Sequence, residues 1–150
     1  MIKLGMEGKL YRNTSVDPDP YANPVWTEVT NVKDLTLNLE KGEADVTTRA
    51  NNGWRATKGT LKEGSIEFEM MWDTEDAGFT AIQAAWFDGT DIEFAAMDGD
   101  ITVAGTEGLR ATCSVISFGR NEPLEEGMSV NVTVKPTYAA NAPEWMTISA

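Results

Sequence analysis

Histidine is absent from this sequence, and cysteine occurs only once, as Cys113. Without imidazole there is no Ser-His-Asp or Cys-His nucleophile pair, no imidazole general base and no His-ligated metal. A single thiol forms no intrachain disulfide and no Cys-rich zinc site. These two absences exclude much of the chemistry on which enzymes and metalloproteins depend.

Positive charge is also scarce. The 150 residues contain 12 Lys and Arg against 24 Asp and Glu, which gives a net charge of −12. The basic residues are scattered and form no run of the kind that binds nucleic-acid phosphates. An acidic surface repels DNA and anionic membranes at short range, so we expect the protein to bind neither through its charge.

Long hydrophobic runs are missing as well. No stretch approaches the ~18 apolar residues that a membrane-spanning helix needs, and the first residues do not resemble a signal peptide. The composition is nevertheless 41% hydrophobic and 9% aromatic, which indicates a packed core rather than disorder. We therefore expect residues 1–150 to form one soluble domain in a reducing compartment.

Alternation of apolar and polar residues dominates the chain and predicts a mainly β protein. The predicted strands cover residues 34–40, 65–72, 91–94, 109–118, 130–135 and 145–148. Asp98-Gly99 predicts a tight hairpin turn that leads into a return strand at 101–103.

One segment follows a helical period instead. Phe79, Ile82 and Trp86 are spaced to share one helix face, which predicts a helix over about 74–87. Asp73 or Thr74 is the expected N-cap, and Asp88-Gly89 is the expected end. The sequence therefore predicts a β-sandwich or barrel with one flanking α-helix.

Two segments follow neither period. Asn13 to Pro24 contains three prolines and is expected to be an irregular loop. Residues 40–63 are expected to form a long structureless loop, which is either functional or mobile. Because this loop carries Val46, Trp54 and Leu61, we favour a loop that becomes ordered on a partner.

Paired carboxylates are the remaining candidates for chemistry. The pairs are Glu67 with Glu69 and Asp91 with Glu93. Their spacing on strands is compatible with a two-carboxylate glycosidase, although a solvated outer face is the simpler interpretation. Helix capping explains Asp73 and its acidic neighbours better than a metal does. We therefore predict no catalytic residue, no cofactor and no metal site.

Short segments along the whole chain, in order, resemble bacteriophage tail tube (major tail) proteins of long-tailed phages. The resemblance is carried by Gly8–Thr14, Asn31–Leu37, Glu43–Arg49, Gly53–Arg55, Ser65–Met70, Trp72-Asp73 with Asp76, Gly108–Ala111, Glu122–Glu126 and Pro143–Trp145. It implies a tail-tube type β-sandwich whose copies form hexameric rings. The rings would stack into a hollow tube, the conduit for genome delivery.

The resemblance also implies partners and a location. The partners would be further copies of the chain, a tape measure protein, and tail terminator and baseplate proteins, with DNA passing through the lumen without specific binding. The protein would lie in the virion tail after assembly in the host cytoplasm.

The same resemblance assigns roles to two groups of residues. The loop at 40–63 would reach the neighbouring ring, with Asp45, Arg49, Trp54 and Arg55 as contact residues. The carboxylates facing the lumen would be Glu67, Glu69, Asp91 and Glu93. Two alternatives stay open: a tube subunit of a contractile injection or type VI secretion system, and a carbohydrate-binding β-sandwich.

Overall fold

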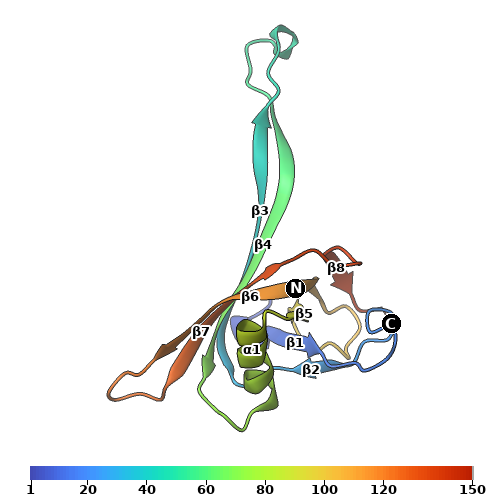
Figure 1. Cartoon of the computed structure of the whole chain (residues 1–150). Helices are drawn as coiled ribbons and strands as arrows, with labels where there is room; N and C mark the ends of the chain where they lie inside the picture. The colour runs from blue at the N-terminus through green and yellow to red at the C-terminus, as the bar shows by residue number, and fades with distance from the viewer. Residues whose placement is uncertain (150) are drawn as a thin grey trace.

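The computed structural model describes residues 1–149 and contains one antiparallel sheet and one α-helix (Figure 1). Neighbouring strands of the sheet follow the order β2-β1-β5-β6-β7-β4-β3, and β8 makes an additional pairing with β6. The strands are β1 (Lys9–Asn13), β2 (Trp26–Glu28), β3 (Val32–Asp45), β4 (Thr57–Met71), β5 (Asp91–Met97), β6 (Glu107–Asn121), β7 (Ser129–Pro136) and β8 (Glu144–Thr147). The helix is α1 (Ala77–Asp88), and short 3-10 turns lie at Gly5–Glu7 and Arg49–Asn51.

The mainly β fold with one flanking helix is therefore confirmed. The predicted hairpin at Asp98-Gly99 is wrong, because β5 ends at Met97 and β6 begins only at Glu107. Within this connection Asp98 Oδ1 accepts a hydrogen bond from the Glu107 backbone N–H at 3.0 Å, and Asp100 Oδ1 accepts one from Thr102 at 2.9 Å. Such side-chain-to-backbone bonds stabilise a wider loop in place of a return strand at 101–103.

The main core lies between α1 and one face of the sheet, and a smaller buried cluster of Tyr11, Ala95 and Met97 lies on the other face. Alternate residues of β4 and β7 point into the main core, so the period of two in the sequence is realised as a buried apolar face. The side chains that are almost completely buried include Ile66, Met70, Phe79, Ile82, Phe94, Val130, Val132 and Val134. Burying one such side chain stabilises the fold by about 1.5–3 kcal/mol.

The helix begins three residues later than the sequence predicts. Asp76 is the N-cap, with its Oδ2 accepting from the Phe79 N–H at 3.4 Å, whereas Asp73 Oδ1 accepts from Glu75 and closes a turn before the helix. The helix ends at Gly89, whose φ of 70° is the left-handed C-cap conformation that glycine favours.

The predicted helix face is wrong in one position. Phe79 and Ile82 are buried, but Trp86 is 44% exposed and Ala85 occupies the third core position. Ala85 follows Ile82 by three residues and therefore lies on the helix face that packs against the sheet. Because the Ala85 side chain is small, α1 can lie close to β6. Trp86 lies instead against Phe87, with ring centroids 5.0 Å apart.

The largest correction concerns residues 40–63, which we call the arm; the rest of the described chain is the body. The arm is not a structureless loop: β3 and β4 remain paired as far as Asp45 and Thr57, and the ribbon projects far from the body (Figure 1). Only residues 46–56, the arm tip, lie outside the strands. Both faces of the ribbon are exposed, so it needs no apolar alternation, and the sequence signal for a strand is absent.

Candidate functional site

The arm brings together the four residues proposed as contacts with a neighbouring copy. Asp45 ends β3, and Arg49, Trp54 and Arg55 belong to the arm tip. Trp54 is 79% exposed, and the Arg55 Nη1 to Asp45 Oδ2 distance of 3.9 Å is a loose, solvated ion pair. Figure 1 shows the tip standing clear of the body, so these side chains are available to a partner.

The arm tip has a defined shape although it touches little else. Val46 N–H donates to the Ala56 carbonyl at 2.9 Å, and Thr48 Oγ1 accepts from Ala50 at 3.3 Å. Hydrogen bonding from the hydroxyl and backbone N–H of Thr47 lowers the pKa of Asp45. These local bonds hold the tip in one conformation, which lowers the entropy lost when it binds.

Exposed apolar side chains accompany the charges on the arm. Leu61 is 82% exposed and Val46 is 48% exposed, in addition to Trp54. Residues 40–45 extend the ribbon by about 20 Å at ~3.3 Å per residue. A long ribbon that carries exposed aromatic and aliphatic groups to its end is a binding device rather than part of the core.

A second candidate surface is the polar face, the side of β3–β4–β7–β6–β5 that faces away from α1. Glu67 lies opposite Thr36 and Thr133, and Glu69 lies opposite Asp34 and Asn131. Asp91 lies opposite Ser114, which is in turn opposite Lys135. By strand register all four predicted carboxylates lie on this face, since Glu93 is two residues from Asp91 on β5.

Glu93 does not belong with these solvated carboxylates. Its side chain is 11% exposed, and its Oε2 lies 3.0 Å from Arg110 Nε, whose side chain is 8% exposed. Asn13 Nδ2 donates to Glu93 Oε1 at 2.7 Å. The connection between β1 and β2 covers this part of the sheet, which strand periodicity does not reveal, so Glu93 is a buried, neutralised charge.

Arg110 is the residue that sequence reasoning missed. Its Nη2 donates to the Tyr21 carbonyl at 2.6 Å, and its guanidinium lies 3.7 Å from the centroid of the Tyr21 ring. Trp26 flanks the same guanidinium at 5.1 Å. Arg110 thus anchors the proline-rich connection to the sheet through an ion pair, a hydrogen bond and cation–π contacts. The sequence feature that could have indicated this role is the position of Arg110 between two apolar residues on a predicted strand.

The single thiol, that of Cys113, is unsuited to act as a nucleophile. Cys113 is fully buried, and desolvation raises its pKa to about 12, so the thiol stays protonated near neutral pH. Residues 1–149 contain no group of three or more Cys, Asp or Glu side chains arranged to hold a metal ion. In the same part of the chain, no helix combines the length and apolar character needed to cross a membrane.

A folded body that presents an exposed arm and carboxylates on one sheet face is typical of a protein that acts through surface contacts. Residues 15–136 match the phage tail tube protein family. The match covers most of the chain, which therefore belongs to this family and is a structural tail tube subunit. No curated protein sequence matches the chain.

Solved structures share this fold. The tail of an empty GTA particle with C6 symmetry superimposes with a TM-score of 0.73 at 15% identity, covering 97% of this chain and 100% of that one. The SPP1 tail tube gives 0.71 at 14% identity, covering 99% and 81%. A chain of the anti-feeding prophage baseplate gives 0.61 at 7% identity, covering 100% and 99%.

Proposed function

We propose that this tail tube subunit assembles as hexameric rings that stack into a hollow tube, the conduit for genome delivery. The observation that carries the proposal is the arm, which holds exposed apolar and charged side chains clear of a body with the tail tube fold. The six-fold symmetry of the GTA tail, a structure with the same fold, supports the ring size.

In this assembly the arm tip contacts the next ring. Trp54 supplies a large apolar group of the kind that dominates binding energy at interfaces. Arg49 and Arg55 supply guanidinium groups that pair with carboxylates, which a chain of net charge −12 offers in surplus. Asp45, which accepts a hydrogen bond from the Thr47 N–H, lies beside Arg55 at the edge of the contact.

The polar face lines the lumen. Glu67, Glu69 and Asp91 place carboxylates where DNA phosphates pass, and repulsion acts over a Debye length of about 8–10 Å. Because no basic cluster interrupts this face, DNA moves through without a specific contact. Glu93 is excluded from this role, since its charge is paired with Arg110.

Electron microscopy of the concentrated protein tests the proposal directly. We expect rings or tubes for the natural chain, and a folded protein that cannot polymerise into tubes for a chain lacking residues 43–60. A natural chain that stays monomeric at every concentration contradicts the proposal. Circular dichroism and thermal unfolding of the deletion variant are the control for its fold.

The lumen assignment has a separate test in whole particles. Glu67→Lys with Glu69→Lys leaves the core untouched, so tubes should form, but basic side chains should slow or trap the DNA during ejection. Glu122→Lys with Glu125→Lys, in the turn between β6 and β7, has the same change in charge away from the polar face and is the control. Normal ejection from the Glu67/Glu69 variant contradicts the assignment.

The proposal extends to partners and location. A tape measure protein, a tail terminator and baseplate proteins are the expected contacts besides further copies, in a virion tail assembled in the host cytoplasm. Family membership favours the tail tube over a carbohydrate-binding module. The fold shared with the anti-feeding prophage baseplate supports a tube subunit of a contractile system as the second candidate. Copurification with a sheath protein would distinguish that candidate.

A further inference from the structure

The base of the arm contains two pairs of like charges. The register of β3 and β4 places Glu40 directly opposite Glu63, and Lys41 directly opposite Lys62. Residues directly opposite each other project from the same face of a ribbon, and the next pair projects from the other face. One face of the arm base therefore carries two carboxylates, and the other carries two ammonium groups.

Nothing within the described chain compensates for these pairs. All four side chains are exposed, and within residues 1–149 none of them makes an ion pair of 4.0 Å or less. Like charges directly opposite each other destabilise a two-stranded ribbon. If Lys62 and Glu63 were exchanged, the composition would stay the same but both opposing pairs would join opposite charges. The like-charge pairs are therefore unfavourable in an isolated arm, which points to a partner that supplies the opposite charges.

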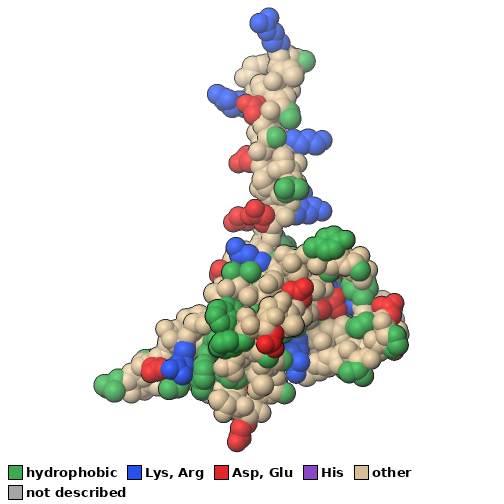
Figure 2. Space-filling view, viewed as in Figure 1, with side chains coloured by type: hydrophobic (Ala, Val, Ile, Leu, Met, Phe, Trp, Pro, Cys, Tyr) green, Lys and Arg blue, Asp and Glu red, His purple; other side chains and the backbone are tan. Residues whose placement is uncertain are grey.

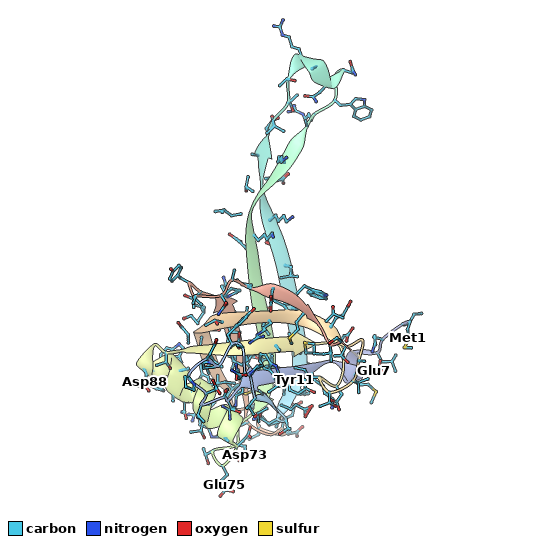
Figure 3. All side chains as sticks on the ribbon, turned by 90° about the vertical axis from the view of Figure 1, so that its right-hand side faces the viewer. Met1, Glu7, Tyr11, Asp73, Glu75 and Asp88 are labelled. Carbon is cyan, nitrogen blue, oxygen red and sulfur yellow. The ribbon has the colours of Figure 1, made fainter. Side chains whose placement is uncertain are left out.

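The two charged faces complement each other. Figure 2 shows the carboxylates of the arm mainly on one side and the lysines mainly on the opposite side. Figure 3 shows the two strands of the ribbon twisting around each other above the body. This twist rotates the two charged faces of the ribbon relative to the faces of the body's sheet.

We propose that the Lys41/Lys62 face of each arm packs against the Glu40/Glu63 face of the arm of a neighbouring copy. This inference rests on the proposed function, since it assigns a partner to the arm within the assembly. The contact joins two different faces, so it is heterologous and directional, and repetition around an axis closes a ring. Each like-charge pair gains the opposite charge that it lacks in the monomer.

The overall charge distribution favours such a contact between arms. Residues 40–63 contain five basic and four acidic residues, a net charge of +1, which leaves −13 for the rest of the chain. The bodies therefore repel one another, whereas the arms do not. A contact between complementary charge pairs sets orientation and excludes wrong arrangements more than it adds affinity.

Charge reversal tests the contact. Glu40→Lys with Glu63→Lys changes the net charge from −12 to −8, which weakens general repulsion. If general repulsion governed assembly, this variant would assemble more readily. With arm-to-arm packing, both faces become basic, and we expect rings to need about tenfold more protein or to be lost.

Two further samples make the test specific. Lys41→Glu with Lys62→Glu makes both faces acidic and should also fail alone, but an equal mixture of the two variants should form rings in which they alternate. A chain with all four substitutions has the natural composition and complementary faces of reversed sign, and it should assemble at the natural concentration. Thermal unfolding of each variant is the folding control, with no shift expected at these exposed positions.

The outcomes separate the two proposals. Assembly of both double variants at the natural concentration, or failure of the mixture and of the fourfold variant to recover, overturns the arm-to-arm contact while the natural chain still forms tubes. Failure of the natural chain to form rings overturns the proposed function, and this contact with it. Electron microscopy and sedimentation velocity over a concentration series provide the readout.

Discussion

The arm is the continuation of two strands of the body, β3 and β4, but the two regions differ in what surrounds their side chains. Inside the body, β4 alternates buried and exposed residues, with Ile66, Phe68 and Met70 packed under α1. A few residues earlier, in the arm, every residue of β4 from Thr57 to Glu63 is exposed. The body is therefore stabilised by its own core, whereas the residues of the arm bury almost no surface within the described chain.

Truncating the core should have the largest effect on stability. Phe79→Ala removes a fully buried ring that contacts Trp72 and Phe118, and should lower the free energy of unfolding by about 3–5 kcal/mol. Urea denaturation measures it. Leu61→Ala in the arm is the matched control, with a change within about 0.5 kcal/mol. Equal losses for both variants would contradict the division into body and arm.

The ion pair under the proline-rich connection should come next. Arg110→Ala leaves the Glu93 carboxylate buried without its partner, and should cost about 3 kcal/mol in the same measurement. The exposed pair of Arg120 and Glu122 is the natural comparison, because Arg120→Ala should cost no more than about 1 kcal/mol. A small effect at Arg110 would mean that water reaches Glu93 in the folded protein.

The arm tip should show the opposite behaviour. Trp54→Ala should leave the unfolding midpoint unchanged, since the side chain packs on nothing in the body, but should weaken assembly by about 2 kcal/mol per contact. Sedimentation over a concentration series measures this. Trp54→Phe keeps an aromatic group and should recover part of the loss. A stability loss in the monomer would show that the tip contributes to the body.

Protonation of Asp45, at the junction of β3 and the arm tip, should produce the smallest effect. The folded pKa of Asp45 lies below its ordinary value of 3.8 because Thr47 bonds to the ionised form. That contribution is complete above the ordinary pKa and is lost as the pH falls through the lowered folded pKa. NMR of the Thr47 amide should follow this titration, and Asp45→Asn should abolish it. An unchanged titration in that variant would assign the effect to another group.

Several elements could be predicted from residues alone because they bury one face. The strands at 65–72 and 130–135 show a period of two in the sequence, and the C-cap at Gly89 follows from local geometry. The arm gave no such signal, because both of its faces are exposed and neither selects apolar residues at alternate positions. Trp86 was misplaced because the third core position depends on how closely α1 approaches the sheet, which the helical period does not specify.

Composition and residue pattern predict a mainly β protein without imidazole chemistry, the strands from β3 to β8 at least in part, the single helix and the acidic balance, but not β1 or β2. The predicted features follow from composition and from side-chain periodicity, which are local properties. The pairing of β3 and β4 as far as Asp45 and Thr57, the ion pair of Glu93 with Arg110, and the position of Glu40 opposite Glu63 emerge only when the chain is folded. Strand register and the covering of one sheet face by a distant connection bring together residues far apart in the chain, and no local pattern encodes those distances.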